Sequence, residues 1–75
     1  MSIDHDAEEP LYLQLAAILR GQIRSGDIVQ RVPSVKTLTQ QYEVAQGTAE
    51  RALAVLREEG LIRSRLGRGH FVVRD

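Results

Sequence analysis

The sequence predicts a small, mainly α-helical domain that ends in a β-hairpin. Residues 10–59 contain three stretches in which apolar residues recur with the 3.6-residue spacing of helices. After Gly60 the pattern changes to two short strand-like runs, 61–65 and 70–74. Between them, residues 66–69 include two glycines, which is typical of a hairpin loop. At 75 residues, three helices and a small sheet are about the most that one core can support.

The composition excludes several classes of protein. The chain has no cysteine, so it can form neither disulfides nor thiolate zinc sites. No apolar run approaches the roughly 20 residues that cross a bilayer, and the acidic first residues are unlike a signal peptide. We therefore expect no membrane association.

Residues 1–9 lack periodic apolar residues and are predicted to be a disordered acidic tail, which leaves residues 10–75 as the domain. Asp4, His5 and Asp6 would bind a metal only with further ligands that the rest of the chain does not offer. We predict no metal site and no cofactor.

The first helix is expected from Pro10 to Ser25. Proline suits the first turn of a helix, and Gly26 supplies a left-handed stop. Tyr12 on this helix could contact a ligand, although packing or a subunit contact is the commoner role at such a position.

Residues 28–32 are partly β-branched and fit either a single short strand or an extended link. Pro33 ends this run and keeps Val32 out of the helical region. Ser34 is a good N-cap for a second helix that extends to Tyr42.

Residues 43–47 are predicted to form a turn, and a third helix follows from Thr48 to Glu59. On a helical wheel one arc of this helix is apolar, and the opposite arc is free to meet a partner; the free arc holds Gly47, Glu50, Arg51 and Ala54. Two helices in this order form a helix-turn-helix, which presents the outer face of its second helix to a DNA groove.

The formal net charge of zero hides an asymmetry along the chain. Four of the ten acids lie in the tail, so the chain from Pro10 onward has ten basic and six acidic residues, about +4. The hairpin region is basic, with Arg65 before the loop and Arg68 at its tip. A basic hairpin after a helix-turn-helix is a wing, which can lie along the DNA backbone or enter the minor groove.

Five motifs in this order and spacing resemble the N-terminal winged helix-turn-helix domain of the GntR family of bacterial transcription regulators. They are Pro10-Leu11-Tyr12-Leu13-Gln14-Leu15, Arg31-Val32-Pro33-Ser34, Thr48 with Arg51-Ala52-Leu53, Glu59-Gly60-Leu61-Ile62, and Gly67-Arg68-Gly69-His70-Phe71-Val72. The resemblance covers about residues 10–73.

The resemblance implies a sequence-specific DNA-binding regulator, usually a repressor that acts in the bacterial cytoplasm as a homodimer on a near-palindromic operator. A separate effector domain usually follows in the family, and we expect no effector pocket in these 75 residues. The implied contacts are Ser34, Lys36, Ala45, Gln46, Thr48, Glu50 and Gly67. Position on the free arc or in the wing adds Gly47, Arg51, Arg65, Arg68 and Gly69.

The chain departs from the family pattern at three of these positions. Ala45 replaces a small hydroxyl residue, and Gln46 and Glu50 each replace an arginine. Ala45 cannot cap the third helix. Gln46 can pair with adenine, and Glu50 can accept a hydrogen bond from the amino group of cytosine. A bland role for Glu50, pairing with Gln46 or Ala54 along the helix, is disfavoured here because neither neighbour is a cation.

Two other classes of function remain as alternatives. The lost arginines and the neutral total would also fit a winged helix kept for protein–protein contact. An enzyme is disfavoured, because His5 lies in the tail, His70 lies on a strand, and so small a domain lacks a pocket wall.

Overall fold

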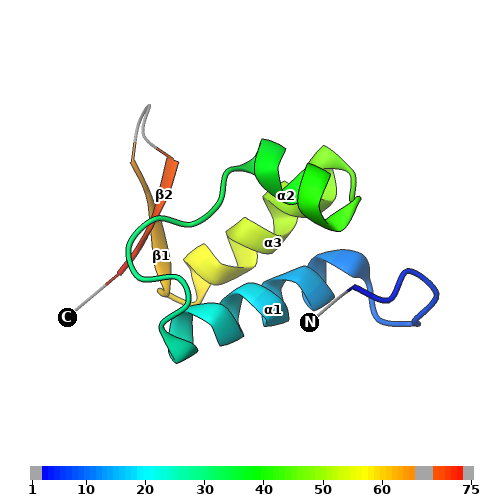
Figure 1. The fold of residues 1–75 in the computed structure, drawn as a ribbon, viewed down its shortest axis with the longest axis horizontal. Helices are drawn as coiled ribbons and strands as arrows, with labels where there is room; N and C mark the ends of the chain where they lie inside the picture. Colours follow the sequence, from blue (N-terminus) through cyan, green and yellow to red (C-terminus); the bar gives the residue numbers. More distant parts are fainter. Residues whose placement is uncertain (1–2, 66–68, 74–75) are drawn as a thin grey trace.

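The structure, a computed structural model, describes residues 3–65 and 69–73. Three helices and an antiparallel hairpin follow one another in the order α1 (Leu11–Ser25), α2 (Val35–Tyr42), α3 (Gln46–Glu58), β1 (Ile62–Arg65) and β2 (Gly69–Val72). Both α1 and α2 pack on α3, and the hairpin stands beside the C-terminal end of α3 (Figure 1). The predicted architecture of three helices and a C-terminal hairpin is confirmed.

The first two helices begin and end where local signals place them. The carbonyl of Pro10 accepts the first hydrogen bonds of α1, and Gly26 ends that helix in the left-handed region at φ 90°. At the start of α2, the Ser34 hydroxyl accepts a hydrogen bond from the Thr37 amide at 3.1 Å. The predicted bounds of both helices are therefore confirmed to within one residue.

The third helix begins at Gln46, two residues before the predicted start at Thr48. Glu43 takes the left-handed conformation at φ 55° and turns the chain, so the backbone can re-enter a helix directly after Ala45. The Ala45 carbonyl then accepts from the Ala49 amide at 3.1 Å. The prediction that Gly47 belongs to the turn is wrong, because this glycine lies inside the first turn of α3.

As the sequence predicts, Ala45 makes no side-chain capping bond, although its extended backbone (φ −68°, ψ 155°) is that of an N-cap. We expect Ala45→Ser to raise the free energy of unfolding by about 1 kcal/mol, measured by urea denaturation. Ser34→Ala, which removes an existing cap of nearly the same backbone geometry, should lower it by a similar amount. If Ser34→Ala lowers the free energy of unfolding and Ala45→Ser does not raise it, a hydroxyl at position 45 does not reach the α3 amides.

The core is formed by side chains from all three helices and the first strand. The apolar arc predicted for the third helix is buried, as expected, through Ala49, Ala52, Leu53 and Leu56. The largest fully buried side chains of the described residues are Leu15, Leu19, Leu38, Leu53, Leu56 and Ile62.

At the rim of this core, the Arg20 guanidinium contacts the Glu59 carboxylate through two hydrogen bonds, and this contact lowers the pKa of Glu59.

Residues 3–9 contact the first helix and the core. Ile3 packs against the core. The Gln14 side chain on α1 accepts from the Asp4 amide at 2.8 Å and donates to the carbonyls of Asp4 and Glu9 at 2.9 Å. The side chain of Gln14 thus contacts the backbone that precedes α1 at two residues, Asp4 and Glu9.

The segment between α1 and α2 is an extended link with one β-bridge, between Arg31 and Phe71. On either side of this bridge the Val32 amide donates to the His70 carbonyl at 3.0 Å, and the Val72 amide donates to the Gln30 carbonyl at 2.8 Å. The sequence left open whether residues 28–32 form a strand or an extended link. The structure has the extended link, which is hydrogen-bonded to the free edge of β2.

Candidate nucleic-acid interface

The first turns of α2 and α3 border a shared groove. It is lined by Val35, Lys36 and Thr39 from α2 and by Gln46 from α3. Ser34 fixes the start of α2 by its cap, and the left-handed Glu43 brings the chain back so that α3 starts close by. Two predicted site residues, the exposed Lys36 and Gln46, are thus brought together although ten positions separate them.

The other predicted positions on these helices offer less side-chain chemistry. The Ser34 hydroxyl is engaged within α2, since it also donates to Thr37 Oγ1 at 3.0 Å. Ala45 and Gly47 are exposed, and Thr48 is half-buried. A Cβ built on Gly47 would meet nothing within 4 Å, so no packing requirement explains a glycine there.

Glu50 has a partner on its own helix. The Gln46 amide nitrogen donates to Glu50 Oε1 at 3.0 Å across one helical turn, and both side chains are exposed. The sequence argument disfavoured this pairing because Gln46 is not a cation, and that judgement is wrong, because an amide N–H can donate to a carboxylate without carrying a charge.

Arg51 lies against α1. Its guanidinium carbon is 4.2 Å from the centroid of the Tyr12 ring, which is the geometry of a cation–π contact. Tyr12 therefore has a packing role, one of those considered for it. The structure does not bring Arg51 into the groove that Lys36 and Gln46 border.

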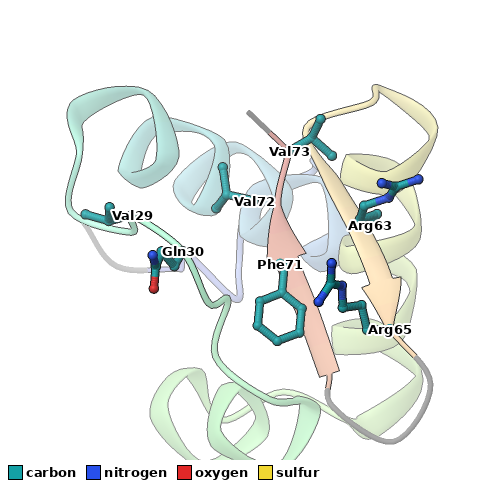
Figure 2. A pocket seen from close by; sticks show the side chains of 7 residues that line it. All are labelled: Val29, Gln30, Arg63, Arg65, Phe71, Val72 and Val73. Carbon is teal, nitrogen blue, oxygen red and sulfur yellow. The ribbon is translucent and has the colours of Figure 1, made fainter. Parts of the chain in front are cut away.

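The outward face of the hairpin carries arginines around one aromatic ring. Arg65 and Arg31 lie over the Phe71 ring, with guanidinium carbons 5.6 and 6.0 Å from its centroid. Figure 2 shows Arg63, Arg65 and Phe71 on neighbouring strands, with Val29 and Gln30 of the link across from them. The sequence argument includes Arg65 in the site and leaves out Arg31, because only the bridge to Phe71 brings Arg31 to this face.

The predicted site residues of the wing loop lie at the limit of the described chain. Gly69 begins β2 at φ 91°, a conformation that glycine adopts readily, and a Cβ there would be 3.8 Å from the Arg31 guanidinium. Gly67 and Arg68 lie outside the described residues.

A cleft between α3 and the wing is lined by Val35, Glu50, Leu53, Arg57 and His70. Burial, and then the nearby charge of Arg57, lower the pKa of His70. The lowered pKa favours the neutral imidazole, which can both donate and accept a hydrogen bond. Arg57 and His70 are absent from the predicted site. Helical spacing could have indicated Arg57, which lies seven residues after Glu50 and so on the same face of α3.

Within residues 3–65 and 69–73, no three His, Asp or Glu side chains gather closely enough to hold a metal ion. Among the helices of this described part, none has both the length and the apolar character that a membrane span requires.

The sequence matches the model of a protein family described as bacterial regulatory proteins, gntR family, over residues 11–72. Among individual proteins, it is 32% identical over 74 residues to the HTH-type transcriptional repressor NagR of Bacillus subtilis (strain 168). That alignment covers 96% of this chain and 30% of NagR. The chain thus spans less than a third of this relative.

Solved structures agree with the family match. YtrA from Sulfolobus acidocaldarius, a GntR-family transcription factor, superposes with a TM-score of 0.89 at 26% identity, covering 99% of this chain and 80% of YtrA. The DNA-binding domain of AraR in complex with operator ORE1 superposes with a TM-score of 0.83 at 28% identity, covering 97% and 94% of the two chains. The predicted winged-helix fold is confirmed, and the chain belongs to the gntR family of bacterial regulatory proteins.

Proposed function

We propose that this chain is the sequence-specific DNA-binding domain of a gntR-type transcriptional regulator, acting as a repressor. In this proposal α3 enters the major groove with its first turn, and the basic wing lies on the backbone or in the minor groove. The predicted contacts at Ser34, Lys36, Gln46, Glu50 and Arg65 remain part of the proposal.

The observation that carries the proposal is the exposed first turn of α3 beside Lys36 of α2. A helix N-terminus with an adjacent cation suits base edges flanked by phosphates. The AraR domain, which has the same fold, was crystallised with operator DNA, and NagR is named a repressor. These relatives support the same role for this chain.

We expect Arg65→Ala to weaken binding to every DNA sequence alike and to reduce the slope of log affinity against log salt by about one unit. Arg65 is exposed on β1, next to the wing loop, where a phosphate contact carries no sequence information. Titrations of operator and random duplexes at several salt concentrations measure both quantities.

Arg24→Ala is the matched control, since it removes one exposed arginine from the last turn of α1. An equal change in slope for both variants would indicate a general effect of net charge. An unchanged slope for Arg65→Ala would mean that Arg65 makes no contact with a phosphate. Absence of DNA binding even at low salt would favour the protein–protein alternative.

We further propose that two copies bind a near-palindromic site, with half-sites about one helical turn apart. One short recognition helix reads only a few base pairs, so a second copy supplies the rest of the specificity. Footprinting and stoichiometry test this arrangement. A footprint of a single half-site that saturates at one protein per duplex would contradict it.

From this DNA-binding role we infer that the protein acts in the bacterial cytoplasm, on the nucleoid when bound. In gntR regulators of greater length, regulation by an effector would belong to segments beyond these 75 residues, and we assign no effector to this domain. A thermal-shift screen of small metabolites against this chain tests that assignment, and a saturable shift would contradict it.

A further inference from the structure

Gln46 and Glu50 form a unit in which only one orientation of the amide is chemically possible. A carboxylate is purely an acceptor, so the amide nitrogen of Gln46 must face Glu50, as it does at 3.0 Å. The amide oxygen then faces away from the carboxylate. One amide hydrogen is used by Glu50, and the other hydrogen and Oε1 remain for a partner.

We infer that Glu50 is a positioning residue that orients Gln46 to read an A·T base pair in the major groove. Adenine presents N7 as an acceptor and its N6 amino group as a donor, which match the N–H and Oε1 that Gln46 has left. This inference rests on the proposed DNA binding and adds the base that is read, together with the residue that prepares the reading.

The position of the pair along α3 favours Gln46 as the residue that touches the base. Gln46 is the first residue of α3, and Glu50 lies one turn further along. Recognition helices of this class contact base edges through their N-terminal residues. A neutral amide can also approach the phosphate-lined groove without the repulsion that a carboxylate meets.

The glycine at position 47 also supports a close approach of DNA to Gln46. Glycine disfavours a helix interior, yet Gly47 stands in the first turn of α3 with open space where a Cβ would be. The absence of a side chain beside Gln46 removes an obstacle between the base edges and this turn. Packing gives no reason for the glycine, whereas close approach of DNA does.

The experiment compares the wild-type protein with Gln46→Ala, Glu50→Ala, Glu50→Gln and the double alanine variant. A bound sequence is first selected from a random pool, and affinities are then measured for every single-base variant of one half-site and for random DNA. Glu58→Ala, which removes another exposed carboxylate of α3, is the control for charge. Circular dichroism monitors the fold of each variant.

The wild-type protein should prefer A·T at one position of each half-site by about 5- to 150-fold over the other pairs. Gln46→Ala should abolish this preference, and Glu50→Ala should reduce it several-fold. Glu50→Gln should give an intermediate preference, because its amide oxygen can accept the same hydrogen bond while its amide nitrogen also permits the reversed orientation of Gln46. With Gln46 already changed to Ala, Glu50→Ala should alter nothing at that base pair.

Three results would overturn the positioning role. One is an intact preference in Glu50→Ala. Another is a preference for cytosine that survives in Gln46→Ala and disappears in the double variant, since Glu50 would then read the base itself. The third is a preference in Glu50→Gln that is no stronger than the one in Glu50→Ala. If the wild-type protein binds no DNA even at low salt, the proposed function is refuted together with this inference. If it binds DNA without an A·T preference, only this inference is refuted.

Discussion

Replacing Leu38 with alanine should lower the free energy of unfolding by about 2–5 kcal/mol. Leu38 is fully buried, and the other residues of α2 are half-buried or exposed. An eight-residue helix is too short to be stable alone in water, so α2 depends on its packing against α3. Leu38 is the most deeply buried part of that contact, and the half-buried Val35 and Tyr42 pack at its edge. Since domains are stable by only about 5–15 kcal/mol, with small ones near the lower end, the loss should leave much of the protein unfolded.

Urea denaturation followed by circular dichroism measures this loss, and hydrogen exchange locates it in the amides of α2. Leu13→Ala is the matched control, because the same side chain on α1 is 36% exposed. We expect Leu13→Ala to change stability by less than about 0.5 kcal/mol. Similar small losses for both variants would contradict the view that one leucine anchors α2.

The fold was predictable where local signals and long-range packing agree. Pro10, Gly26 and Ser34 mark the ends of α1 and α2 in ways that depend only on neighbouring residues. The start of α3 has no such signal, since Ala45 does not cap and Gly47 is typical of a turn. The left-handed Glu43, a conformation uncommon for a non-glycine residue, sets that start and could not be predicted from the sequence.

The candidate site was predictable in position and less so in its contacts. Helical spacing correctly placed Glu50 on the exposed face of α3, whereas Gln46 was expected in the turn and entered the site only through the family resemblance. The hydrogen bond between the two residues depends on side-chain conformations. The contact of Arg51 with Tyr12 requires the packing of α3 on α1, and the role of Arg31 requires the bridge to Phe71. Such contacts join residues far apart in the sequence, and periodicity carries no information about them.

Glu50→Arg should raise the affinity for random DNA on the order of 10-fold at low salt and add about one unit to the salt slope. The substitution replaces an exposed anion on the proposed DNA face with a cation that can contact a phosphate. It also removes the carboxylate that accepts from Gln46, so the preference at one position of each half-site should relax. A switch toward guanine is the other expected form of this change, because arginine pairs with guanine through two hydrogen bonds.

Glu58→Arg is the control for this last prediction, because it makes the same change of charge about 12 Å further along α3. The two variants and the wild-type protein are compared on the selected operator, on each single-base variant of one half-site and on random DNA. Equal gains for both variants would attribute the effect to net charge alone. Unchanged affinities for Glu50→Arg on all three kinds of DNA would place Glu50 away from the duplex. In that case the exposed face of α3 would be better explained as a contact surface for another protein.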